Sequence, residues 1–243
     1  MSKKTLYRQY RPQSFEDVFG QTHVKKTLSF ALSSDNYAHS YLFAGPRGVG
    51  KTTIARIISR SVNCKNRKDG EFEPCNTCDS CISILNGSAI DVIEIDAASN
   101  RGIDEVRQLR ENARTSTSIL KKKVFIIDEV HMLTKEAFDA LLKTLEEPAP
   151  HIMFILATTE LHKIPATIIS RCQVFEFKTL QTNELVDYLK KIAEQENKEI
   201  SDEVLQFIAR FSGGYVRDAV SLLGQVFTFQ TQSLEEIREF FGI

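Results

Sequence analysis

The chain has 243 residues, of which 42% are hydrophobic and 26% are charged, and its formal net charge at pH 7 is −1. The length suits one large domain, or a large domain followed by a small one, and the composition is ordinary for a globular protein. A charge this close to zero excludes nucleic-acid binding through overall basicity, so any contact with DNA has to come from a local patch.

The sequence carries no sign of export or of membrane insertion. No stretch of about 18 apolar residues occurs, so no membrane span is predicted. The opening residues, MSKKTLYRQYRP, have neither the apolar core nor the small-residue cleavage site of a secretory signal. The cytoplasm is therefore the expected location.

Up to about residue 178, short β-rich runs alternate with helical patterns. The runs are Ser40–Ala44, Val92–Ile95, Val124–Ile127, Ile152–Ala157 and Val174–Phe177. Several of them are continuously apolar, which is typical of parallel strands covered on both faces. The alternation predicts a doubly wound α/β sheet with right-handed crossovers. A predicted helix at Lys135–Leu145 stops before Pro148, and Lys121–Lys123 is interpreted as a solvated turn before a strand.

A glycine-rich loop follows the first of these strands. Residues Gly45 to Thr52, GPRGVGKT, match the G-x-x-x-x-G-K-[ST] pattern completely and precede a predicted helix. Backbone N–H groups of such a loop surround phosphates at a helix N-terminus. We expect Lys51 to reach the β- and γ-phosphates and Thr52 to bind Mg²⁺. The alternative is a glycine-rich turn that matches by chance. The candidate nucleotide-binding residues here are Gly45, Pro46, Arg47, Gly48, Val49, Gly50, Lys51, Thr52 and Thr53.

Four of the five cysteines are clustered just after this helix. They are Cys64, Cys75, Cys78 and Cys81. Four thiolates suffice for a closed, structural zinc site, and metal binding would help to fold an insertion with little apolar content. The C-x2-C-x2-C run also begins an iron–sulfur pattern, but the C-x3-C-P continuation is missing. Reduced cysteines without a metal are the third interpretation. Cys172 stands apart.

Another motif, which contains two acidic residues, lies at the end of the third predicted strand. Residues Val124 to His131 read VFIIDEVH and deliver Asp128 and Glu129 at the carboxyl end of a buried strand, where open α/β sheets bind ligands. We expect Asp128 to hold Mg²⁺ and Glu129 to orient and polarise an attacking water. The alternative is an acidic pair that caps a helix. His131 is interpreted as structural.

After residue 178 the pattern is wholly helical, with Leu185, Leu189 and Ile192 on one apolar stripe. This predicts a nucleotide-binding α/β domain over residues 1–178, with a cysteine insertion at about 64–81, and a small helical lid over 179–243. Helix boundaries are predicted from Ser201 as an N-cap, Gly213-Gly214 as a C-terminus, a start near Val216, and Ser233 with Glu236 as a capping box.

These motifs, together with Ser170-Arg171-Cys172 and the opening YRQYRPQSFEDVFGQ, make the chain resemble the clamp-loader ATPases of the AAA+ class. The four-cysteine insertion narrows the resemblance to the bacterial gamma/tau subunits of the DNA polymerase III holoenzyme, over essentially the whole chain. The resemblance implies an AAA+ P-loop NTPase with a five-stranded parallel sheet, a zinc-binding insertion and a helical lid. It also implies the first two domains of such a subunit, without the collar that drives oligomerisation, so this chain alone is expected to be monomeric.

The resemblance assigns further roles. Arg171 matches an arginine finger that acts in trans on the ATP of a neighbouring subunit; the alternative is a local ion pair. Arg217 matches the lid arginine that contacts the γ-phosphate, and a cation in the first turn of a helix does need an anion nearby. A solvated pair of Arg217 with Asp218 is the competing interpretation. Thr158 and Thr159 both match the sensor position, with Thr159 preferred. The adenine-pocket candidates are Tyr10, Arg11, Pro12 and Val18.

A basic stripe could contact DNA. Arg107, Arg110 and Arg114 follow at helical spacing after Arg101. The resemblance places this region at the centre of a ring through which DNA passes, so contacts to phosphates are one interpretation. A solvated stripe balanced by nearby acidic residues is the other: Asp104, Glu105 and Glu111.

The expected function is that of an ATPase motor subunit that loads the sliding clamp onto primed DNA during replication. The implied cofactors are ATP, Mg²⁺ and Zn²⁺, and the implied partners are the delta and delta-prime subunits, further gamma/tau copies, the sliding clamp and primer-template DNA in the replisome at the nucleoid. No polymerase active site is expected. The alternatives are a non-hydrolysing clamp-loader subunit and a P-loop kinase that phosphorylates a small acceptor.

Overall fold

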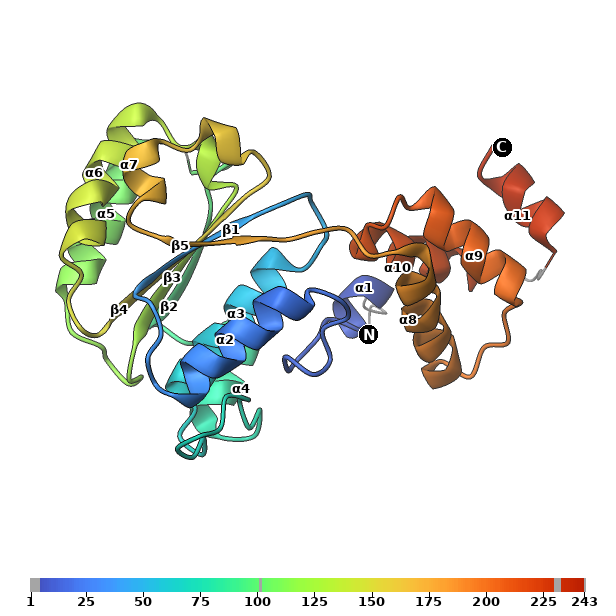
Figure 1. Ribbon diagram of the computed structural model, residues 1–243, viewed down its shortest axis with the longest axis horizontal. Coiled ribbons are helices and arrows are strands. Elements are labelled where there is room, and N and C mark those ends of the chain that lie inside the picture. The colour runs from blue at the N-terminus through green and yellow to red at the C-terminus, as the bar shows by residue number, and fades with distance from the viewer. Residues whose placement is uncertain (1–4, 101, 230–232, 243) are drawn as a thin grey trace.

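The structure, a computed structural model, describes residues 5–100, 102–229 and 233–242. Within these ranges five strands form one parallel sheet in the order β2-β3-β4-β1-β5, which confirms the predicted α/β fold (Figure 1). The strands are β1 (Ser40–Ala44), β2 (Val92–Asp96), β3 (Lys123–Asp128), β4 (Ile152–Thr158) and β5 (Gln173–Glu176).

Helices cover both faces of the sheet, so the residues inside β1, β3 and β4 are apolar and only residues at the strand ends are polar (Figure 1). In β3, Val124 and Ile126 point into one core, and Phe125 and Ile127 point into the other. This alternation explains a continuous hydrophobic run in a parallel strand. The first face packs against α2 (Thr22–Ser33) and α3 (Lys51–Asn63), with α4 (Asp79–Leu85) beside α3. The second packs against α5 (Ile103–Arg114), α6 (Lys135–Glu146) and α7 (Ala166–Ile169).

Parallel pairing brings the carboxyl ends of β1, β3 and β4 to one edge of the sheet. Ala44 is in register with Thr158, and Ile127 is in register with Leu156. The loop after β1, the acidic pair after β3 and the threonines that end β4 therefore meet at this edge. Two short 3-10 turns, η1 (Val130–Met132) and η2 (Leu161–Lys163), follow β3 and β4.

The helical lid consists of α8 (Thr182–Gln195), α9 (Asp202–Phe211), α10 (Val216–Val226) and α11 (Leu234–Phe240). It has its own hydrophobic cluster. Ser201 caps α9 by accepting a hydrogen bond from Val204 N at 3.4 Å, and the following turn passes through Gly213 and Gly214 at φ +61° and +82°. The division into two domains after residue 178 remains a prediction.

The N-terminal segment, residues 5–19, reaches from the α/β part to the lid. Its short helix α1 (Leu6–Gln9) lies against α10, where a Cβ on Gly224 would lie 3.3 Å from the Leu6 Cβ (Figure 1). Tyr7, Tyr10 and Phe19 pack against the lid cluster as well. The lid is thus in contact with the N-terminal segment.

Two sequence predictions about local structure were wrong. Lys123 does not lie in a solvated turn: it is buried at the start of β3, where its ammonium group donates to the carbonyls of Asn112, Thr115 and Ser116. The helix after Ser233 begins as predicted, but the Ser233 side chain makes no capping hydrogen bond. No helix among the described residues is long and apolar enough to cross a bilayer.

Candidate nucleotide-binding site

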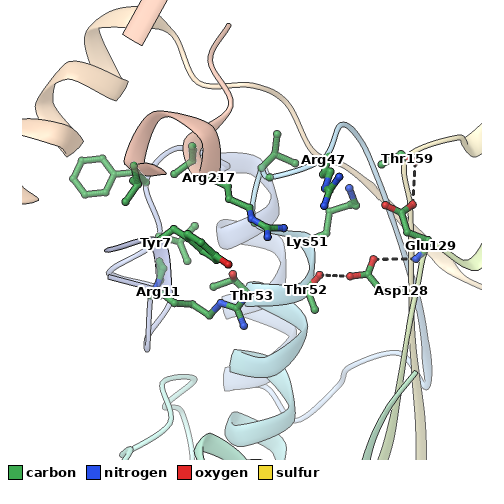
Figure 2. Close-up of a pocket in the computed structure, with 18 of the residues that line it drawn as sticks. Tyr7, Arg11, Arg47, Lys51, Thr52, Thr53, Asp128, Glu129, Thr159 and Arg217 are labelled. Carbon is green, nitrogen blue, oxygen red and sulfur yellow. Dashed lines mark hydrogen bonds between the residues drawn. The ribbon is translucent and has the colours of Figure 1, made fainter. Parts of the chain in front are cut away.

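A cavity of about 570 Å³ lies between the carboxyl edge of the sheet, the N-terminal segment and the lid (Figure 2). The phosphate loop lines it with Arg47 to Thr53, and the sheet edge lines it with Asp128, Glu129 and Thr159. The lid contributes Arg217. Clefts at this edge of open α/β sheets are where such folds bind their ligands.

The glycine that opens the phosphate loop has no room for a side chain. Gly45 has φ +146°, and a Cβ there would lie 2.3 Å from the carbonyl oxygen of Phe177. The Lys51 ammonium group donates to the carbonyls of Gly45 and Pro46 at 2.6 and 2.7 Å. Gly45 and Pro46 thus bind the Lys51 side chain through their carbonyls, and they do not line the cavity. Burial lowers the pKa of Lys51, while the carboxylates of Glu129 and Asp128 raise it.

A short chain of hydrogen bonds joins the phosphate-loop helix to the end of β3 (Figure 2). Thr52 Oγ1 donates to Asp128 Oδ2 at 2.7 Å, and Glu129 N donates to Asp128 Oδ1 at 2.9 Å. A hydroxyl and a carboxylate oxygen are the ligands that Mg²⁺ prefers, so the two side chains fit that ion. Glu129 has φ +49°, a left-handed conformation that a glutamate adopts at a cost. With this backbone conformation, the Glu129 side chain lines the cavity.

The two threonines at the end of β4 have different surroundings. Thr158 is fully buried; its hydroxyl lies 3.0 Å from His131 Nδ1 and accepts a hydrogen bond from Glu160 N. Thr159 lines the cavity, and its hydroxyl donates to Glu129 Oε2 at 3.0 Å. Thr159 can therefore contact a ligand in the cavity. The hydroxyl of Thr158 instead contacts His131 and Glu160, in the segments that follow β3 and β4. His131 also lines the cavity and reaches Glu160, with Nε2 to Oε1 at 3.2 Å.

Arg217 enters the cavity from the first turn of α10 (Figure 2). Its guanidinium lies 4.7 Å from the centre of the Tyr7 ring, and its backbone N–H donates to Gly48 O at 3.3 Å. Gly48 has φ +79°, and a Cβ there would lie 3.1 Å from Arg217 Cβ. The lid therefore touches the phosphate loop directly. Hydrogen bonds with Arg8, Thr5 and Arg217 lower the pKa of Tyr7 to about 8.

All four predicted adenine-pocket residues, Tyr10, Arg11, Pro12 and Val18, line the cavity. The Tyr10 hydroxyl points away from it and donates to Glu196 at 2.7 Å; burial and this carboxylate raise the pKa of Tyr10 to about 12. The apolar wall has further members that the sequence reasoning missed. They are Tyr7, Phe19, Met132, Tyr188, Val216 and Val220, and Asp96 and Ala98 also line the cavity. Tyr7 and Phe19 lie within the opening YRQYRPQSFEDVFGQ, whereas Asp96, Tyr188 and Val220 come from separate stretches of the chain that no motif marks.

Arg171 lies apart from the cavity. It follows α7 and donates to Thr167 O at 2.6 Å and to the carboxylate of Glu146 at the end of α6. This position is consistent with an arginine that serves a neighbouring subunit. It is equally the local ion pair that the alternative interpretation expects.

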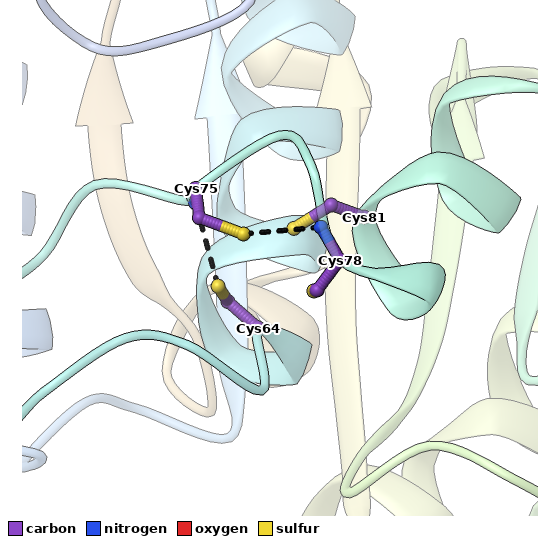
Figure 3. A group of neighbouring side chains, drawn as sticks. All are labelled: Cys64, Cys75, Cys78 and Cys81. Carbon is purple, nitrogen blue, oxygen red and sulfur yellow. Dashed lines mark hydrogen bonds between the residues drawn. The ribbon is translucent and has the colours of Figure 1, made fainter.

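The four clustered cysteines come together as a compact group, with all four sulfur atoms within 4.8 Å of one another (Figure 3). Four thiolates around one tetrahedral zinc ion are about 3.8 Å apart, so the group needs only a small contraction to hold that metal. Cys75 N donates to Cys64 Sγ at 3.4 Å, and Cys78 N donates to Cys75 Sγ at 3.3 Å. Cys172 lies elsewhere, and burial raises its pKa to about 11.

The basic stripe lies on α5. Arg107 and Arg114 are exposed, Arg110 is half-buried, and Arg101 lies outside the described residues. Arg114 takes part in no ion pair among those that the described residues form. The exposed positions leave both interpretations of the stripe open.

Comparison with known proteins gives a family model and relatives that are all described as DNA polymerase III subunits. The family model described as DNA polymerase III, delta subunit, matches residues 20–181. The chain is 52% identical to DNA polymerase III subunit tau of Bacillus subtilis over 97% of its own length and 41% of that protein. It is 44% identical to subunit tau of Escherichia coli, over 93% of the chain and 35% of the relative. It therefore spans between 35% and 41% of the length of these two relatives.

Among solved structures, the RuvB Holliday junction branch migration motor of Thermotoga maritima superimposes with a TM-score of 0.68. The identity is 22%, over 96% of this chain and 72% of that one, so this likeness shows the fold alone. The fold is that of an AAA+ P-loop NTPase with a five-stranded parallel sheet and a helical lid. The cysteine group is compatible with zinc.

Proposed function

Because the chain belongs to the DNA polymerase III subunit family, with gamma and tau subunits as its relatives, we propose that it binds and hydrolyses ATP as the motor part of a clamp-loader subunit. The observation that carries the proposal is the hydrogen-bonded chain from Thr52 through Asp128 to Glu129, set between the phosphate loop and Arg217. A candidate metal-ligand pair followed directly by a second carboxylate that lines the cavity suits water as the nucleophile.

Each side chain has a defined task in this proposal. The phosphate loop and Lys51 bind the β- and γ-phosphates, and Thr52 with Asp128 would hold Mg²⁺, which supplies positive charge against the phosphates when bound. Glu129 accepts a hydrogen bond from the attacking water and polarises it. Thr159 keeps the Glu129 carboxylate in place until the γ-phosphate offers a competing partner for its hydroxyl. Lys51 leaves its two backbone carbonyls when phosphates arrive.

The lid reports the nucleotide state. Arg217 pairs with the γ-phosphate, and its contact with Gly48 passes the change to the phosphate loop. ATP can drive an assembly only through a difference in affinity for two arrangements. A cation on the lid that meets the γ-phosphate supplies such a difference, because ADP lacks that group.

The proposal extends to the assembly. Arg171 leaves its pair with Glu146 and completes the site of an adjacent subunit, in a ring with delta, delta-prime and further gamma/tau copies. ATP binding favours the ring that holds the sliding clamp open on primed DNA, and hydrolysis releases the clamp closed. Arg107 and Arg114 are the candidates for contacts to DNA phosphates, because both are exposed on α5. Zinc in the cysteine group has a structural role.

The test is ATP hydrolysis by a full-length subunit that carries this chain, assembled with delta and delta-prime, with and without clamp and primed DNA. We expect strong stimulation by clamp and DNA together, and a loss on the order of 10³-fold or more in Arg171→Ala. Arg210→Ala, at an exposed position in α9, is the control. An assembly that binds ATP without hydrolysing it would support the non-hydrolysing alternative, and phosphate transfer to a small acceptor would support a kinase.

A further inference from the structure

The cysteine insertion, residues 64–81, is not among the segments that line the nucleotide cavity, but it contacts the N-terminal segment, which does line it. Residues 13–17 of the N-terminal segment lie between two groups of cavity-lining residues: Tyr10, Arg11 and Pro12 before them, and Val18 and Phe19 after them. Whatever fixes residues 13–17 therefore fixes the wall of the cavity that is formed by the N-terminal segment.

One carboxylate of the insertion holds two backbone amides of this stretch. Phe15 N donates to Glu73 Oε2 at 2.9 Å, and Glu16 N donates to Glu73 Oε1 at 3.0 Å. Glu73 is partly buried, and hydrogen bonds to a charged acceptor are stronger than neutral ones. Both oxygens of this side chain are thus directed at residues that are 58 and 57 positions away in the sequence.

The insertion and the end of α3 hold the same stretch at a second point. The Gln13 carbonyl accepts from Asn76 Nδ2 at 3.0 Å and from the guanidinium of Arg60 at 2.7 Å. Phe15 is buried and meets the Phe72 ring edge-on, with the ring centres 6.0 Å apart. Polar and apolar contacts therefore act together on residues 13–15.

The cysteine group sets the position of these contact residues. Residues 64–78 are all described and contain neither helix nor strand, so no backbone ladder holds them. Glu73 and Asn76 flank Cys75, whose N–H donates to Cys64 Sγ at the end of α3. Fixing Cys75 in the cysteine group therefore fixes the backbone on either side of it.

We propose that the cysteine insertion positions residues 10–19, and that Glu73 is the positioning residue through which metal occupancy of the cysteine group raises nucleotide affinity. The inference rests on the proposed nucleotide site. Its physical basis is preorganisation: a wall that is already ordered loses less freedom when a ligand binds. The insertion thereby serves the nucleotide site without touching the nucleotide.

The experiment uses the whole chain in Glu73→Ala and Glu73→Gln variants, with Glu71→Gln as the matched control. Glu71 lies in the same insertion, but its carboxylate accepts only from Lys68 N among the hydrogen bonds that the described residues form. Two quantities are measured: hydrogen exchange of peptides that cover residues 10–20, and the dissociation constant of a fluorescent ATP analogue. Circular dichroism establishes that each variant is folded.

We expect faster exchange across residues 13–18 and nucleotide binding weaker by about five- to twentyfold in Glu73→Ala, the effect of losing hydrogen bonds to a charged group. Glu73→Gln, which keeps one acceptor oxygen, should fall between wild type and Glu73→Ala, and Glu71→Gln should match wild type. Wild-type chain stripped of metal by a chelator should show the same increase in exchange.

Exchange in Glu73→Ala that equals wild type, or an affinity within twofold of wild type despite faster exchange, would overturn the inference. A wild-type chain that binds no nucleotide would instead overturn the proposed function. The exchange of residues 13–18 would then still decide whether the insertion holds this stretch.

Discussion

At the scale of single residues, the left-handed backbone of Glu129 places a carboxylate beside the Asp128–Thr52 pair, where it can act on water. We expect Glu129→Gln to lose hydrolysis by about 10²- to 10⁴-fold, the usual contribution of a general base, because an amide cannot polarise water in the same way. Nucleotide affinity should stay within about threefold, since no phosphate contact is removed. Steady-state hydrolysis and ATP-analogue binding check both parts, with the exposed Glu147→Gln as control.

Tyr7 gives the site a titrating group near neutral pH. Hydrogen bonds with Arg8, Thr5 and Arg217 lower its pKa to about 8, whereas burial raises the pKa of Tyr10, Tyr41 and Tyr188 to about 12. A lowered pKa means that the folded chain favours the phenolate, so this stabilisation is complete above pH 10 and is lost as the pH falls through about 8.

An absorbance titration of tyrosinate should therefore show a step with its midpoint near pH 8 that is missing in Tyr7→Phe. Arg217→Ala should move the midpoint upward, because one of the three donors to the phenolate is removed. A step that survives in Tyr7→Phe would assign it to another tyrosine.

The residues that could be predicted from the sequence are those that follow one another in a motif. Lys51 and Thr52 are adjacent in the phosphate loop, and Asp128 and Glu129 end one strand, so spacing alone places them. Tyr7, Tyr188 and Val220 also line the cavity, but they reach it from the N-terminal segment and the lid. Their positions depend on how the lid packs against the rest of the chain, and a local sequence pattern does not predict that packing.

At the scale of elements, Lys123 shows why a charge run was misread. Its position next to Lys121 and Lys122 suggested solvent, but strand pairing with Ile152 carries it into the interior. There it donates to carbonyls in the loop that follows α5. Three consecutive lysines look alike in sequence, but only Lys123 belongs to β3, whereas Lys121 and Lys122 precede the strand.

Lys123→Met should lower the free energy of unfolding by about 1–3 kcal/mol, because carbonyls at the end of α5 lose their donor. Lys121→Met, at an exposed position, should leave it within about 0.5 kcal/mol of wild type. Urea denaturation of the two variants measures the difference. Equal midpoints would mean that the buried ammonium contributes nothing to the α5–β3 connection.

At the scale of the whole molecule, the cavity takes residues from the sheet edge, the N-terminal segment and the lid, so a bound nucleotide should stabilise all three together. At a ligand concentration of 100 times the dissociation constant, the gain is about 2.7 kcal/mol. For a chain of this size that raises the melting temperature by roughly 5–10 °C. Differential scanning calorimetry with and without ATP analogue measures it, and Lys51→Ala should abolish the shift while Arg210→Ala retains it.

Most of the architecture could be predicted from the sequence pattern, because β3 and β4 contain continuous apolar runs between or before their polar end residues and helical patterns separate the strands. The order of the strands could not be predicted from single residues. Which neighbour β1 takes depends on the crossovers between strands and on the packing of helices against both faces. The contacts between α1 and α10 likewise join residues that are remote in the sequence.

The position of β1 between β4 and β5 in the sheet has a consequence for synthesis on the ribosome. β1 is complete at Ala44, but its two neighbours begin only at Ile152 and Gln173. At translation speeds of 5–20 residues per second, the nascent chain carries the apolar strand SYLFA with both edges open for roughly 5–20 s. Such a strand is a template for aggregation. We therefore expect a chaperone at the ribosomal exit tunnel to bind this segment until the fourth strand emerges.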